Sequence, residues 1–66
     1  MNVNYSTRPL ITINEAADLL AVNRNTVRRL ISRHEIEAIR ITDTRIAVVS
    51  ESIISYIQRR MKLSVD

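Results

Sequence analysis

Four residues close together in the chain carry side chains that are suited to reading the edges of DNA base pairs: Arg24, Asn25, Arg28 and Arg29. Arginine pairs with guanine and asparagine with adenine through two hydrogen bonds, and each pairing contributes about 1–3 kcal/mol of discrimination between bases. If these residues begin a helix, they occupy the part of a recognition helix that reaches base edges first. The pattern therefore indicates DNA recognition, the alternative being solvated side chains on an exposed helix face.

The residues beside this group are suited to holding the helix against phosphate. Asn23 and Thr26 are expected to bond the helix locally and to contact the DNA backbone rather than to read bases. Ser32 and Arg33 lie on the same outward side and complete this backbone set. The segment 24–33 contains four arginines and no acidic residue, a charge pattern that favours binding to phosphate.

Two short amphipathic helices must position these side chains. Thr12 and Glu15 have the spacing of a capping box, which predicts a helix from Ile13 to about Leu20. Asn23 is a favourable N-cap for a second helix. Apolar residues at helical spacing give that helix its expected buried side: Val27, Leu30 and Ile31. Two such helices joined by a tight turn form a helix-turn-helix motif.

The apolar pattern then changes from helical to alternating. Segments 36–41 and 45–49 are rich in β-branched residues and flank the polar residues 42–44, which predicts a β-hairpin. Ser50 is expected to cap a last helix over residues 51 to about 62. The expected apolar side of that helix consists of Ile53, Ile54, Tyr56, Ile57 and Met61. The predicted fold class is α+β, mainly α, in the order helix, helix, hairpin, helix.

The length and composition limit the possible functions. The 66 residues predict one DNA-binding domain over 10–62, with a flexible arm at 1–9 and a tail at 63–66. With no cysteine, one histidine and no glycine, neither an enzyme, a cofactor nor a metal site is expected. The apolar runs are too short to span a membrane, and the N-terminal segment lacks the hydrophobic centre of a signal peptide. These two features predict a cytoplasmic protein that does not bind membranes.

The net charge is positive and is carried mainly by arginine. Ten Lys plus Arg against seven Asp plus Glu give a net charge of +3, and nine of the ten basic residues are arginine. Arginine favours bidentate contact with phosphate and guanine, although a GC-rich genome would produce the same ratio. Arg59, Arg60 and Lys62 end the last helix. They are candidates for contacting flanking DNA or a partner, with solvated helix-end charges as the alternative.

Segment 11–41, ITINEAADLLAVNRNTVRRLISRHEIEAIRI, resembles the excisionase-type DNA-binding domain. This family is a small winged helix-turn-helix related to the DNA-binding heads of MerR-like regulators, and the resemblance extends over residues 10 to about 57. It implies that the second helix enters a major groove of double-stranded DNA, while the hairpin forms a wing beside the backbone or minor groove. The wing residues implied as contacts are Arg40, Thr42, Thr44 and Arg45.

The resemblance also implies a biological role. Such a factor binds and bends DNA near the attachment site of a phage or mobile element, and promotes excision by an integrase. The implied partners are DNA, an integrase or other recombinase, and further copies bound cooperatively on the DNA, in association with the nucleoid of a bacterial host. Two alternatives stay open: a small helix-turn-helix transcriptional regulator or repressor, and a protein-interaction adapter that does not bind DNA. Only nine residues follow Ile57, which favours the accessory factor over a MerR-like regulator.

The chain departs from the family pattern at its turns. Ala21 and His34 replace glycines expected after the two helices, and both are expected to accept positive φ. Asn23 replaces the usual serine cap, a mild chemical change. Residues 42–44 replace a tip that contains glycine and arginine, and phosphate would repel the Asp43 carboxylate. DNA contact is therefore expected from the second helix more than from the wing.

Overall fold

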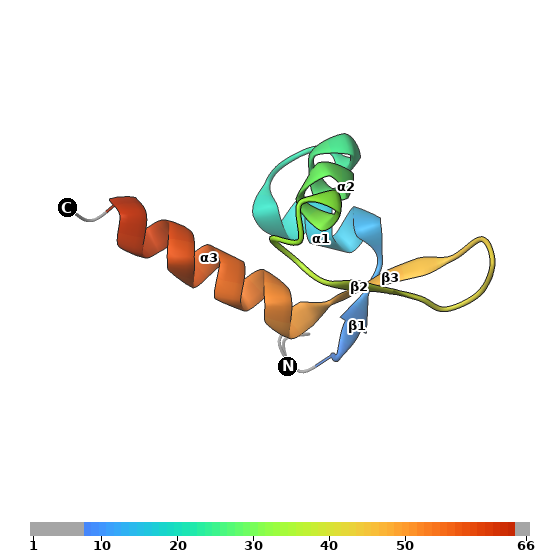
Figure 1. The fold of residues 1–66 in the computed structure, drawn as a ribbon. Helices are drawn as coiled ribbons and strands as arrows, with labels where there is room; N and C mark the ends of the chain where they lie inside the picture. Colours follow the sequence, from blue (N-terminus) through green and yellow to red (C-terminus); the bar gives the residue numbers. More distant parts are fainter. Residues whose placement is uncertain (1–7, 65–66) are drawn as a thin grey trace, which may run out of the picture.

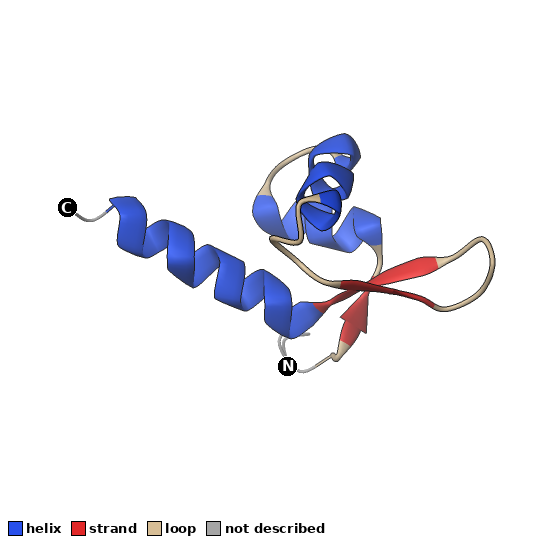
Figure 2. Ribbon diagram, in the orientation of Figure 1, coloured by secondary structure: helices blue, strands red, loops and turns tan. Residues whose placement is uncertain are grey.

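A computed structural model describes residues 8–64, which form three helices and a small antiparallel sheet (Figure 1). In chain order the elements are β1 (Leu10–Ile11), α1 (Ile13–Leu20), α2 (Arg24–Ser32), β2 (Ala38–Arg40), β3 (Ile46–Val49) and α3 (Ser50–Ser64). Helix predominates, and the β2–β3 hairpin extends from the body on the side opposite to α3 (Figure 2). The predicted winged helix-turn-helix is confirmed. Of the predicted arm and tail, residues 1–7 and 65–66 lie outside the described residues.

The start of α1 is fixed by hydrogen bonds within four residues. Thr12 Oγ1 accepts from Glu15 N at 3.0 Å, while Glu15 Oε1 accepts from Thr12 N at 2.9 Å, so the predicted capping box is confirmed. Arg8 Nη1 donates to Glu15 Oε2 at 3.2 Å. The backbone N–H of Thr12, followed by the positive charge of Arg8, lowers the pKa of Glu15 below its ordinary value, although partial desolvation opposes this.

Both helices of the motif end in a left-handed residue that is not glycine. Ala21 has φ 58° and ψ 42°, and His34 has φ 61°, as expected for residues that replace family glycines. In each case this residue and its successor donate their N–H groups back to the preceding turn, which is the Schellman arrangement. The bonds are Ala21 N to Asp18 O (3.2 Å), Val22 N to Ala17 O (3.0 Å), His34 N to Ile31 O (3.0 Å) and Glu35 N to Leu30 O (2.9 Å).

The sheet has three strands rather than the two of the predicted hairpin. Its strand order is β1-β3-β2, with Leu10 opposite Val49 on one side of β3 and Ala38 opposite Val48 on the other. Strand β1 is not among the predicted elements, because two apolar residues after Pro9 are too few to show an alternating pattern. Strand β1 ties the start of the motif to the base of the wing.

The predicted cap of the last helix is wrong. Strand β3 continues directly into α3, so Ser50 is the first helical residue and not a cap that precedes the helix. Its backbone N–H donates to Pro9 O at 3.0 Å and extends the β1–β3 pairing into the helix. Among the described residues, its buried hydroxyl has no hydrogen-bond partner. Helix α3 also continues to Ser64, beyond the predicted end near residue 62.

Every helix and strand except β2 contributes to one small core. Its buried apolar residues are Ile11, Ile13, Ala16, Ala17, Val27, Leu30, Ile36, Val48 and Ile53. Tyr56 and Ile57 of α3 are half-buried against this core, but Met61 is 59% exposed. The predicted burial of Met61 is therefore wrong, because α3 extends past the body on which it packs (Figure 1).

Candidate nucleic-acid interface

One side of α2 is buried and the opposite side carries the four residues predicted to read bases. Val27 and Leu30 are in the core, which fixes the rotation of α2 about its own axis. With this rotation the helix exposes Arg24, Asn25, Arg28 and Arg29. They form two i, i+4 rows, so their side chains share one surface of the helix. Arrangement on a single exposed surface is the geometry needed for insertion into a major groove.

The N-cap of α2 brings a further group of donors beside this surface. Asn23 Oδ1 accepts from Thr26 N at 2.9 Å and from Thr26 Oγ1 at 3.1 Å. These two bonds use the amide oxygen of Asn23, so its NH₂ group is oriented to donate elsewhere. The N-terminal N–H groups of the helix lie at the same end and add partial positive charge. This end of α2 is suited to a phosphate oxygen.

The hydroxyl groups in the predicted backbone set are already bonded within the protein. Thr26 Oγ1 donates to Asn23, and Ser32 Oγ donates to Arg29 O at 2.9 Å. A hydroxyl has a single hydrogen, so these groups are poorly placed to donate to phosphate as well. Arg33 is exposed at the C-terminal end of α2. Asn23 and Arg33 are therefore the stronger candidates for contacts with the DNA backbone.

The tip of the wing is held by hydrogen bonds of its own residues. Thr42 Oγ1 accepts from Arg45 N at 3.2 Å, and Arg45 N also lies 3.3 Å from Thr42 O. Arg40 Nη1 donates to Asp43 O at 3.0 Å, so the guanidinium group of Arg40 is folded over the turn. Thr44 and Arg45 are exposed on the wing, as is Asp43 in the loop that joins its two strands. This arrangement gives the wing fewer available donors than the four predicted residues suggested.

Arg59 and Arg60, two of the three basic residues of α3, contact different parts of the molecule. Arg59 Nη2 donates to Glu35 O at 2.9 Å, in the loop that follows α2. Arg60 and Thr26 instead line an open apolar groove of about 340 Å³ between α3 and the N-terminal end of α2. Lys62 is exposed near the far end of α3. The sequence grouped these residues because they are close together in the chain, but Arg59 and Arg60 lie on different sides of the helix.

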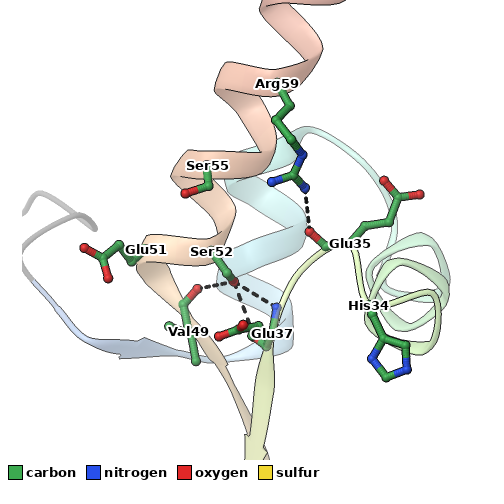
Figure 3. A pocket seen from close by; sticks show the side chains of 8 residues that line it. All are labelled: His34, Glu35, Glu37, Val49, Glu51, Ser52, Ser55 and Arg59. Atoms are coloured by element: carbon green, nitrogen blue, oxygen red, sulfur yellow. Dashed lines mark hydrogen bonds between the residues drawn. The ribbon is translucent and has the colours of Figure 1, made fainter.

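A second open pocket, of about 480 Å³, lies on the other side of α3 (Figure 3). Three acidic residues, Glu35, Glu37 and Glu51, line it together with Ser52 and Arg59. Sequence reasoning did not single out this acidic region, because its residues come from a loop and a helix start far apart in the chain. Within residues 8–64, no group of three His, Cys, Asp or Glu side chains is placed to hold a metal ion. Nor is any helix of this part long and apolar enough to cross a membrane.

Comparison with known proteins supports the assignment made from geometry. No curated protein matches the chain closely enough to be counted as a relative. The sequence profile of a family described as "Helix-turn-helix domain" matches residues 10–61, which include all six elements except the last residues of α3. The matched segment is most of the chain and contains the exposed basic helix, its partner helix and the wing. The chain therefore belongs to this helix-turn-helix family, whose fold suggests DNA binding.

Proposed function

We propose that the protein is a sequence-specific DNA-binding factor of the excisionase type. In this proposal α2 reads a major groove, the protein bends DNA beside the attachment site of a phage or mobile element, and an integrase then carries out excision. The observation that carries the proposal is the exposed surface of α2, where Arg24, Asn25, Arg28 and Arg29 stand opposite the buried Val27 and Leu30. The target would place the protein with the nucleoid of a bacterial cell.

The charge distribution supports one orientation on DNA. Basic α2 and the groove-lining Arg60 lie on one side of α3, while three acidic residues line the pocket on the other side. Phosphate is attracted to the first region and repelled by the second. The DNA is therefore proposed to lie along α2 and past its N-terminal end. An integrase, or a second copy on an adjacent site, would meet the molecule away from this surface.

Base reading and backbone contact are distinguished by two arginine variants. A duplex is first selected from a random-sequence library with the wild-type protein, and the affinities of Arg28→Gln and Arg33→Gln are then measured on it. Arg28→Gln should weaken binding about 5-fold to 150-fold and relax the selected sequence at one position. Arg33→Gln should weaken binding to all duplexes alike and reduce the salt dependence by about one unit of log K per log salt. Equal behaviour of the two variants would contradict base reading by Arg28.

The role in excision needs two further assays. Bending is measured by the migration of circularly permuted DNA fragments, since a bend of about 40–90° costs of order 1–6 kcal/mol that contacts with the protein must offset. Tight binding without a bend would remove the architectural part of the proposal. Excision is measured in a reconstituted reaction with the integrase of the same element, with and without the protein. A dependence of excision on the protein supports the directionality factor.

A transcriptional regulator or repressor is the second candidate, and the helix-turn-helix assignment is compatible with it. Such a protein would use the same exposed surface of α2 on an operator and would leave reconstituted excision unchanged. The adapter hypothesis is supported by the sparse charge of the wing and by Asp43 at its tip. It predicts that the wild-type protein selects no duplex. About five phosphate contacts would instead give a slope of log K against log salt near −4 to −5.

A further inference from the structure

Arg59 makes two contacts that hold its guanidinium group against the protein. Its Nη2 atom donates to the backbone carbonyl of Glu35 at 2.9 Å, a contact that Figure 3 shows directed from α3 to the loop after α2. Its Cζ atom lies 5.8 Å from the centre of the Tyr56 ring, so the positive group also lies over an aromatic face. The edge and the face of the guanidinium are therefore both used within the protein.

The carbonyl that Arg59 binds belongs to a residue that also closes α2. The N–H of Glu35 donates to Leu30 O at 2.9 Å, in the last turn of the helix, while its carbonyl accepts from Arg59. The preceding residue, His34, has the left-handed conformation with φ 61°. A contact at Glu35 therefore acts on the point where the chain leaves α2 and reverses its direction.

A second contact from the same face of α3 holds the other end of this loop. Ser52 Oγ accepts from Glu37 N at 2.9 Å and donates to Val49 O at 2.7 Å (Figure 3). Ser52 and Arg59 are seven residues apart, or about two helical turns, and so share one face of α3. Between their two attachment points lies Ile36, which is 1% exposed. The loop from α2 to the wing is thus attached at three consecutive places.

The surroundings of Arg59 also oppose a role in binding phosphate. Three acidic residues, Glu35, Glu37 and Glu51, line the same pocket as Arg59. Their negative charges would repel phosphate that approaches this side of the molecule. We infer that Arg59 is a positioning residue, which clamps the loop after α2 to α3 and thereby fixes the end of the DNA-binding helix relative to α3. This inference rests on the proposed DNA binding by α2.

Amide exchange and DNA binding together test the clamp. Arg59→Gln should increase the hydrogen-exchange rates of the His34 and Glu35 amides about twofold to tenfold, the effect of one net hydrogen bond. Affinity for a duplex selected by the wild-type protein should fall by a similar factor, while the slope of log K against log salt stays unchanged. Arg59→Lys keeps the charge but loses the planar contact with Tyr56, and should give intermediate exchange with the same slope. Arg60→Gln, the matched control on the same helix, should leave these two amides unaffected.

The possible results separate failure of the clamp from failure of the proposed function. A slope reduced by about 0.9 in Arg59→Gln would show a direct phosphate contact and overturn the inference. Unchanged exchange at both amides would show that Arg59 does not hold the loop, and would overturn it as well. If the wild-type protein selects no duplex, the DNA-binding proposal fails. Faster exchange in Arg59→Gln would in that case still establish the clamp but not a role in positioning α2 on DNA.

Discussion

Replacing Ala21 by glycine is expected to stabilise the protein, because Ala21 closes α1 in the left-handed conformation. Its φ of 58° and ψ of 42° lie in the region where a Cβ approaches the following carbonyl oxygen. This conformation costs a residue other than glycine about 1–2 kcal/mol. Glycine removes that cost but loses about 0.4–1 kcal/mol through the greater freedom of the unfolded chain. The net gain in the free energy of unfolding should be about 0.5–1 kcal/mol.

The gain is large enough to measure in a domain of this size. A change of 1 kcal/mol shifts Tm by about 4–8 °C in a domain of 60–100 residues, so Ala21→Gly should raise Tm by about 2–8 °C. Thermal unfolding followed by circular dichroism measures this shift. His34→Gly should give a smaller gain, since histidine accepts the left-handed region more readily than alanine. The effects should add, because the two residues lie at opposite ends of α2 and share no partner.

The matched control is the same substitution at a helical position. Ala17→Gly, within α1, should lower stability by about 1 kcal/mol from helix propensity, with a further loss because this methyl group is buried. The two Ala→Gly variants are therefore expected to have opposite signs. A lower or unchanged Tm in Ala21→Gly, with the expected decrease in Ala17→Gly, would refute the assignment of strain to the turn.

Three other perturbations test the capping box, the core and the charge of α2. Glu15→Gln should weaken the pH dependence of Tm in acid. The hydrogen bond from Thr12 N lowers the pKa of Glu15 in the folded protein, so Glu15 stabilises the fold fully above its unfolded pKa of about 4.3. This stabilisation is lost as the pH falls through the lower folded pKa. Val27→Ala should lower the free energy of unfolding by about 2–3 kcal/mol, because truncation of this fully buried side chain leaves a cavity. Chemical denaturation measures this change in free energy. Arg28→Glu should raise Tm slightly by replacing a like-charged pair with Arg24 by an attractive one, yet abolish binding to the selected duplex. A lower Tm for this last variant would contradict electrostatic repulsion along α2.

The two helices of the motif were predictable because their end signals are local. The bonds between Thr12 and Glu15, and from Asn23 to Thr26, span three residues each, so residue types at that spacing are enough to place the helix starts. The core face of α2 followed from helical periodicity in the same way. The β-branched segments placed the hairpin at the correct part of the chain. The family resemblance identified that hairpin as a wing.

Features that depend on distant contacts were not predictable from these signals. The partners of β1 lie in β3, and the acceptor for Arg59 is a backbone carbonyl 24 residues earlier, which no residue type reveals. Periodicity placed Met61 on the apolar side of α3, but it does not state how far the body extends beneath the helix. The set of arginines that are candidates for contacting DNA could be reduced only when their contacts with the rest of the protein were known.

Seven of the nine arginines form two groups that differ in their surroundings, and this difference bears on the proposed function. Three donate to oxygens of the protein: Arg8 to the Glu15 carboxylate, Arg40 to the Asp43 carbonyl and Arg59 to the Glu35 carbonyl. The second group consists of the four arginines in segment 24–33, and no acidic residue occurs from position 19 to position 34. The i, i+4 spacing within this group creates like-charged pairs. Each pair lowers the stability of the free helix by about 0.2–0.5 kcal/mol. This repulsion does not contribute to the stability of the fold. A polyanion along α2 would remove it, so the proposed DNA binding gives these charges a role: they weaken the free helix but would strengthen a complex with DNA.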